Sequence, residues 1–193
     1  MLTFNEDEHK YYWNGVTVPG VTNLLAPLNN FGAVPRDVLA AACFRGTAVH
    51  SCCELDDIGE LDESTVDAEW LPYLDAWRLF RFEHVAEWEL IESRVYHKTL
   101  GYAGTPDRFG TVSGLTTVVD IKTSVVVYPS VGPQLSAYLN ALKTMMPDIV
   151  KVERMTVQLG ANGKYKITKH KNDAADWSVF LSFLTIYNYL RNQ

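Results

Sequence analysis

Two aspartates and a lysine mark the stretch of the chain whose side chains are best suited to chemistry. Asp120 lies 13 positions after Asp107, and Lys122 follows two positions later. Asp120 and Lys122 alternate with apolar residues, so a β-strand would project both from the same face. The glycine-rich segment 101–110 predicts a strand and a turn that bring Asp107 back beside Asp120. Two carboxylates next to an ammonium could hold a hard divalent cation while the lysine orients a water that attacks a phosphodiester.

Hydrophobic periodicity predicts the elements that must position these residues. A hairpin that turns at Asn14 and Gly15 is expected over residues 2–18, and a short helix capped by Thr22 follows it. The other expected elements are helices over 35–54, 66–84, 133–146 and 173–190, a strand over 88–97, an acidic loop over 56–65 and a hairpin over 152–169. This order predicts an α/β fold with a mixed central β-sheet flanked by helices.

Further polar residues on these elements complete a recognisable pattern. They are Arg45, Gly46 and His50 on the helix over 35–54, Glu92 on the strand, Gly104 before Asp107, and Gln134 and Tyr138 on the helix over 133–146. Together they resemble the PD-(D/E)XK nuclease superfamily, and within it the RecB-type branch that includes phage exonucleases. That branch shows GxxxH on a helix, an acidic strand residue, GxxD, (D/E)xK and QxxxY in this order. The resemblance covers residues 2–142 and implies a restriction-endonuclease-like core.

The resemblance also implies roles for the matching residues. Mg²⁺ or Mn²⁺ would be the cofactor, because both prefer oxygen ligands. The implied metal-binding residues are His50, Glu92, Asp107, Asp120 and Ile121, the last through its carbonyl. Lys122 would position the attacking water and stabilise the charge on the phosphate, while Gln134 and Tyr138 would orient the lysine or hold a phosphate. Arg45 would grip a DNA phosphate, and Gly46 would let DNA or a neighbouring strand approach closely.

Several of these residues also have ordinary structural explanations. A lone histidine such as His50 is more often structural than a ligand, and Tyr138 on an apolar helix face could equally be a core residue. Asp120 and Lys122 could form an ion pair and have no further role. That explanation would not account for Asp107 in the glycine-rich turn. Glu89 competes with Glu92 for the acidic strand position.

Composition places the chain among globular proteins. Of its 193 residues, 47% are hydrophobic and 12% aromatic, which suits one domain over residues 1–193. No apolar run approaches the ~18 residues of a membrane-spanning helix, and the acidic start lacks the apolar region of a secretory signal. We therefore expect a cytoplasmic protein, in the host cytoplasm if a phage encodes it. Cys43, Cys52 and Cys53 fit this compartment, and we expect them to be buried or partly buried.

Charge and cysteine content narrow the function further. The net charge of −6 argues against a general nucleic-acid coating protein, but it is compatible with an acidic metal site. Seven Lys and Arg residues between positions 143 and 171 form either a basic edge for a phosphate backbone or a solvated hairpin. The three cysteines also lack the clustering of the iron–sulfur members of this branch.

These observations predict a metal-dependent DNA nuclease. Exonuclease action is favoured, because residues 9–22 also resemble the start of small phage-encoded members that process DNA ends for recombination or replication. The alternatives are a structure-specific or single-strand endonuclease, and a DNA-binding protein on a degenerate nuclease fold. An unrelated metal or carbohydrate enzyme would leave Lys122 and the pair Gln134 and Tyr138 unexplained. The expected partners are DNA, a single-strand annealing or binding protein, and further copies of the chain, with no membrane.

Overall fold

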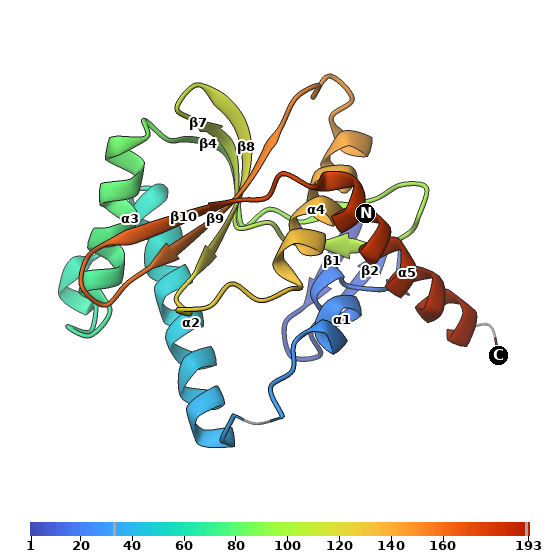
Figure 1. Ribbon diagram of the computed structural model, residues 1–193, viewed down its shortest axis with the longest axis horizontal. Coiled ribbons are helices and arrows are strands. Elements are labelled where there is room, and N and C mark those ends of the chain that lie inside the picture. The colour runs from blue at the N-terminus through green and yellow to red at the C-terminus, as the bar shows by residue number, and fades with distance from the viewer. Residues whose placement is uncertain (33, 192) are drawn as a thin grey trace.

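A mixed β-sheet forms the centre of the computed structural model, which describes residues 1–32, 34–191 and 193. Strands β8 and β9 run parallel, and the other neighbours are antiparallel. Helices cover both faces of this sheet (Figure 1), so the predicted fold class is confirmed. In sheet order the five strands are β10 (Tyr165–Lys169), β9 (Glu153–Leu159), β8 (Leu115–Lys122), β7 (Arg108–Val112) and β4 (Glu87–Ile91).

The alternation of side chains in β8 assigns each helix layer to one face of the sheet. Val119 and Ile121 pack against the cluster that contains Val49 and Trp77, in the layer of α2 (Arg36–Asp57) and α3 (Leu71–Glu83). Val118 packs into the opposite cluster, and Asp120 points the same way. The helices on that side are α4 (Val131–Met145), α1 (Val21–Leu25) and α5 (Asp173–Arg191).

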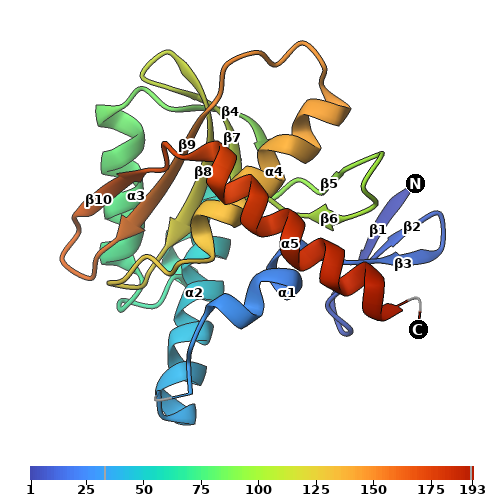
Figure 2. The same ribbon diagram turned by 45° about the vertical axis from the view of Figure 1, so that its right-hand side comes forward.

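Two small sheets lie beside α1 and α5 (Figure 2). One contains β1 (Leu2–Asn5), β2 (Lys10–Trp13) and β3 (Val16–Val18), and the other pairs β5 (Val95–Tyr96) with β6 (Ala103–Gly104). The predicted turn is confirmed, because Asn14 and Gly15 both have positive φ angles, of 49° and 81°. Trp13 stacks on Tyr96 with ring centroids 4.2 Å apart, which joins the two sheets.

Four local expectations were wrong. The short helix is capped by Gly20, with Thr22 inside it, and the helix predicted from 66 begins at Leu71. The strand predicted over 88–97 is split into β4 and β5. Much of the predicted acidic loop is ordered: α2 continues to Asp57, and a 3₁₀ helix, η2, covers Glu63–Thr65. A second 3₁₀ helix, η1, covers Ala26–Leu28.

The first half of α2 extends away from the rest of the molecule (Figure 1). Phe44 is 68% exposed there, and Cys43 is exposed as well, contrary to the expectation that all three cysteines are at least partly buried. Apolar side chains stay in solvent here because no sheet lies beneath these turns. Within the part of the chain that the structure describes, no helix has the length and apolar character needed to cross a membrane.

Candidate metal centre

The predicted acidic residues gather where strands of the central sheet end. Glu92 directly follows β4, Asp107 directly precedes β7, and Asp120 lies near the end of β8. Because β4 and β7 are antiparallel, Glu92 comes opposite Asp107, and its backbone N–H donates to the Asp107 carbonyl at 3.0 Å. Glu92 has a φ of 43°, which non-glycine residues rarely adopt, so the strand ends in a bend at this place. Glu89, the competing acid, is exposed within β4.

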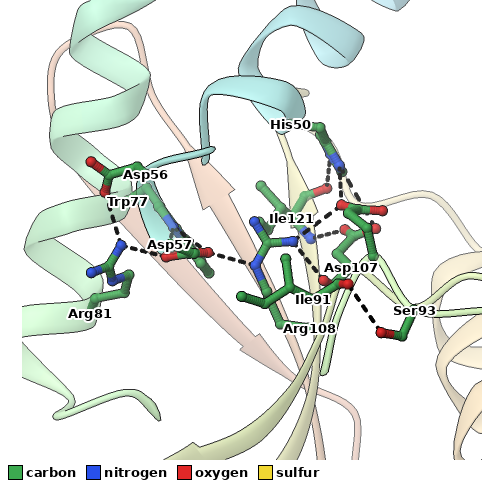
Figure 3. A network of polar contacts seen from close by, with 11 residues as sticks. His50, Asp56, Asp57, Trp77, Arg81, Ile91, Ser93, Asp107, Arg108 and Ile121 are labelled. Atoms are coloured by element: carbon green, nitrogen blue, oxygen red, sulfur yellow. Dashed lines mark hydrogen bonds and ion pairs between the residues drawn. The ribbon is translucent and has the colours of Figure 1, made fainter. Parts of the chain in front are cut away.

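His50 of α2 lies over these carboxylates. Its Nδ1 is 3.7 Å from Glu92 Oε1 and 3.8 Å from Asp107 Oδ1. One potential ligand atom from each of the three residues lies within 4.8 Å of the others. His50 Nε2 is 3.0 Å from the Ile121 carbonyl oxygen, which can only accept, so this nitrogen carries a proton (Figure 3). Burial lowers the pKa of His50, but Asp107 and Glu92 outweigh it and leave the pKa raised.

A second group of polar side chains surrounds Asp120. Lys122 Nζ donates to Asp120 Oδ1 at 2.7 Å, and Gln134 Nε2 donates to the same oxygen at 2.9 Å. Gln134 Nε2 also lies 3.4 Å from the Tyr138 hydroxyl, so both α4 residues face the site. Asp120 Oδ2 is buried and has no hydrogen-bond partner among the described residues. Burial raises the pKa of Asp120 and Lys122 lowers it, while repulsion from Asp107 helps to keep it raised.

Asp107 connects the two groups. Its Oδ2 accepts a hydrogen bond from the Ile121 backbone N–H at 2.6 Å, and its Oδ1 faces His50. Asp107 is buried, and so is Asp120. The glycine-rich turn therefore returns Asp107 to the end of β8, as predicted from the spacing.

The donor set of the site fits a hard divalent cation. Among the described residues, one group of ligand atoms contains the Glu92 and Asp107 carboxylates and the His50 imidazole, and it does not include the predicted ligand Asp120. With the nearby Ile121 carbonyl, this group offers mainly oxygen ligands of the kind that Mg²⁺ and Mn²⁺ favour. The buried, unpartnered Asp120 Oδ2 provides a free acceptor, and two buried carboxylates that repel each other are stabilised by a cation. A surface hollow lined by Gly46, Thr47, His50, Ser51, Glu54 and Glu92 gives access from solvent.

The chain has only distant similarity to proteins of known structure. No protein-family model matches the chain, and no curated protein matches it. The crystal structure of an alkaline exonuclease (LHK-Exo) from Laribacter hongkongensis has 12% sequence identity and a TM-score of 0.40, covering 90% of this chain and 91% of that one. The structure of LHK-Exo in complex with dAMP has 14% identity and a TM-score of 0.35, with coverages of 91% and 92%. Values this low do not assign a function to the chain.

Arg45 lies apart from the other predicted site residues. It precedes His50 by five positions, which on an α-helix places the two side chains roughly 140° apart around the axis. Its Nε is buried and has no hydrogen-bond partner within the described residues. Arg45 lines a separate hollow together with Ala41, Phe44, Glu69, Trp70, Tyr73 and Ala161.

The basic residues between positions 143 and 171 divide into buried and exposed ones. Arg154 is 3% exposed and forms ion pairs with Asp173 and Asp176, so it belongs to the interior. Lys166 of β10 is exposed and lies opposite Gln158, which in turn lies opposite Lys122. Two strand spacings therefore separate Lys166 from the candidate site, or roughly 10 Å.

One residue in contact with the site was missed by sequence reasoning. Arg108 directly follows Asp107, and its Nη1 contacts both the Glu92 carboxylate and the Asp107 carbonyl. The only sequence signal was its position in β7, opposite the buried Val119, where the alternation of side chains places it inside. A charged residue at such a position needs a buried partner, which the sequence alone does not identify.

Proposed function

We propose that the chain is a metal-dependent DNA nuclease in which residues 1–193 form one PD-(D/E)XK domain. The observation that supports this most is the convergence of Asp107, Asp120 and Lys122 at one edge of the sheet, with His50 and Glu92 beside them. The sequence motifs have the order of that superfamily, and hydrogen bonds join Lys122 and Gln134 to Asp120, and Asp107 to the Ile121 backbone.

The carboxylates, His50 and the Ile121 carbonyl would hold Mg²⁺ or Mn²⁺. Such an ion lowers the pKa of a water and offsets the charge of a phosphate. Lys122 keeps its proton: burial lowers its pKa, but the negative charges of Asp120 and Asp107 outweigh burial and raise it. From Nζ it can donate to the attacking water and to the phosphate oxygens on which charge develops.

Gln134 and Tyr138 are positioning residues in this proposal. Gln134 donates to Asp120 Oδ1, while Asp120 Oδ2 has no partner among the described residues, and the Tyr138 hydroxyl lies next to the Gln134 amide. Burial raises the pKa of Tyr138 well above its usual range, so this hydroxyl stays neutral. Arg45 and Lys166 would contact DNA phosphates farther from the reacting atoms.

Exonuclease action is the favoured mode, because the amino-terminal hairpin resembles that of small phage proteins which process DNA ends. Such a protein would act in a host cytoplasm on DNA, and would pass a single strand to an annealing or binding protein. Endonuclease action is the alternative, since the same residues would cleave an internal phosphodiester equally well.

Digestion of end-labelled linear DNA and of closed circular DNA, each with Mg²⁺ or Mn²⁺, tests the proposal. We expect linear DNA to be degraded from its ends and circular DNA to stay intact. Asp120→Ala and Lys122→Ala should each lower the cleavage rate by about 100-fold or more, since the first removes a ligand of the metal ion and the second removes the donor to the developing charge. Cleavage of circular DNA would favour the endonuclease alternative.

Binding of Mn²⁺ separates the roles of the two residues. Asp120→Ala should lose binding, while Lys122→Ala should retain it. Lys151→Ala is a matched control, because Lys151 is exposed beyond the start of β9, at the opposite end of the sheet from Lys122. The proposal fails if both site variants stay folded and cleave DNA like the wild type.

A further inference from the structure

Arg108 connects the candidate metal centre to buried charges between the sheet and α2. Its side chain is fully buried. Nη1 donates to the Asp107 carbonyl oxygen at 2.6 Å and lies 3.2 Å from Glu92 Oε1, while Nε donates to Asp57 Oδ2 at 2.6 Å. One guanidinium thus contacts the proposed ligand residues Glu92 and Asp107 as well as an aspartate of α2. Figure 3 shows Arg108 between Asp57 and Asp107.

Asp57 is held in turn by α3. It is fully buried at the end of α2 and accepts a hydrogen bond from Trp77 Nε1 at 3.1 Å. Arg81 pairs with Asp57 and, at 2.9 Å, with Asp56. The Arg108 guanidinium also lies 5.6 Å from the centre of the Trp77 ring. These contacts fix the direction of Arg108 before any ligand arrives.

Toward the metal centre, Arg108 contacts a carboxylate whose orientation is not fixed by its own backbone. Glu92 has a left-handed backbone, and its carboxylate is partly exposed, so other orientations are open to it. Arg108 Nη1 contacts this carboxylate and also the Asp107 carbonyl, which itself accepts the Glu92 backbone N–H. The backbone bond sets the spacing of the two residues, and Arg108 adds a contact that orients the Glu92 carboxylate.

We propose that Arg108 is a positioning residue of the metal centre, an inference that rests on the proposed function. It holds the Glu92 carboxylate beside Asp107, so both are oriented for the ion in advance. Asp57 anchors it, which links the end of α2 to the site. Groups that orient metal ligands from behind typically change metal affinity by 10- to 100-fold when they are removed.

Arg81 provides a matched control. It pairs with Asp57, as Arg108 does, yet its partners Asp56 and Asp57 both lie outside the metal centre. A purely structural role for this network would make Arg108 and Arg81 equivalent. If Arg108 positions the metal ligands, substitution of Arg108 should lower metal affinity and substitution of Arg81 should not.

The test compares Arg108→Lys with Arg81→Lys in the full chain. A lysine keeps the positive charge next to Asp57, but one ammonium cannot span Asp57 and the site together. Mn²⁺ affinity is measured by electron paramagnetic resonance of the free ion, and folding by thermal unfolding. We expect Arg108→Lys to bind Mn²⁺ at least tenfold more weakly, and Arg81→Lys to stay within twofold of the wild type.

A second pair of changes guards against misfolding. Arg108→Met combined with Asp57→Leu removes both buried charges together, which proteins often tolerate, and should show the same tenfold loss. In a Glu92→Gln background, Arg108→Lys should weaken binding by less than in the wild type, since part of its effect acts through Glu92. Wild-type affinity in a folded Arg108→Lys protein, or an equal loss in Arg81→Lys, would overturn the inference.

Cleavage of linear DNA by the wild type is measured in parallel. A wild type that binds Mn²⁺ tightly and cleaves no DNA would contradict the proposed nuclease function, while the Arg108 comparison would still decide the positioning role. A wild type that cleaves DNA with no difference between the two lysine variants would overturn only the positioning role. A wild type that binds no Mn²⁺ would contradict both.

Discussion

Gly46 lines the hollow that leads to His50, one turn away on α2. A glycine inside a helix is destabilising, and the sequence suggested a close approach by DNA or by a neighbouring strand as its reason. An added Cβ would meet only Thr123 Oγ1, at 3.9 Å, which is ordinary contact. Packing among the described residues therefore does not require a glycine here, and the expected close approach of DNA is open to a direct test.

Gly46→Ala should consequently separate stability from activity. We expect the free energy of unfolding to rise by about 1 kcal/mol in urea titrations, because alanine is the better helix former. DNA cleavage should fall, since the methyl group would stand where the DNA backbone approaches. Ala40→Gly, at an exposed position of the same helix, should lose a similar free energy and leave cleavage unchanged. Undiminished cleavage by Gly46→Ala would rule out the close approach.

Single residues differ in how far the sequence could place them. Asp107, Asp120 and Lys122 were predictable as a group, because a glycine-rich turn and the alternation of one strand bring them together over 16 residues of chain. Arg45 was predicted to lie near His50, but it faces another side of α2. Helical geometry alone predicts this separation, because the two residues are five positions apart. Arg108 was missed because its partners lie far from it in sequence.

At the scale of elements, the backbone of β4 occupies the space that a Cβ at Gly110 of β7 would take. A Cβ at this residue would lie 2.0 Å from the Glu87 carbonyl oxygen and 2.8 Å from Trp88 Cα. The register of β4 also shifts between Trp88 and Leu90. Because backbone atoms cannot move aside like a flexible side chain, only glycine fits between the strands here.

Gly110→Ala should therefore destabilise the protein by about 3 kcal/mol or more, at the upper end of the cost of overpacking. The bend at Glu92 follows β4, so Mn²⁺ affinity should fall as well. Gly114→Ala is the control: Gly114 has a φ of 75° but open space around its Cβ, and should cost only about 1 kcal/mol. Equal unfolding free energies for the two variants in urea would contradict the close approach.

Elements that depend on short-range patterns were predictable, and those that depend on distant partners were not. The hairpin of β9 and β10, the strand β8 and the helices α4 and α5 follow from local periodicity and turn residues. The acidic residues at the end of α2 suggested a solvated loop. Instead Asp56 pairs with Arg78, and Asp57 with Arg108, which lie 22 and 51 positions away. Composition alone does not reveal such pairs.

At the scale of the whole molecule, a buried histidine makes stability depend on pH. His97 is 9% exposed, and its Nδ1 accepts a hydrogen bond from the Leu100 backbone N–H at 3.1 Å. Burial lowers the pKa of His97 from its usual 6.5. The unfolded chain therefore takes up a proton at a higher pH than the folded protein does. The neutral form of His97 therefore contributes fully to the free energy of unfolding above pH 6.5. This contribution is lost as the pH falls through the lowered pKa of the folded protein.

The contribution of His97 to the free energy of unfolding should accordingly decrease between pH 7 and pH 5, while the raised pKa of His50 contributes in the opposite direction. His97→Gln should reduce the slope against pH by up to one proton, measured by urea titration at several pH values. Part of the slope should remain, because burial and Arg154 also lower the pKa of His170. A slope in His97→Gln equal to that of the wild type would contradict this account.

The order of strands and the layers of helices set the arrangement on which everything else depends. Only the complete fold brings the ends of β4 and β8 and the start of β7 under His50. Anomalous diffraction at the manganese edge, from crystals soaked in Mn²⁺, tests this most directly. We predict a peak bound by Asp107 and Asp120 and close to His50, and its disappearance in Asp120→Ala crystals. The account is contradicted if the two carboxylates point apart with no peak between them.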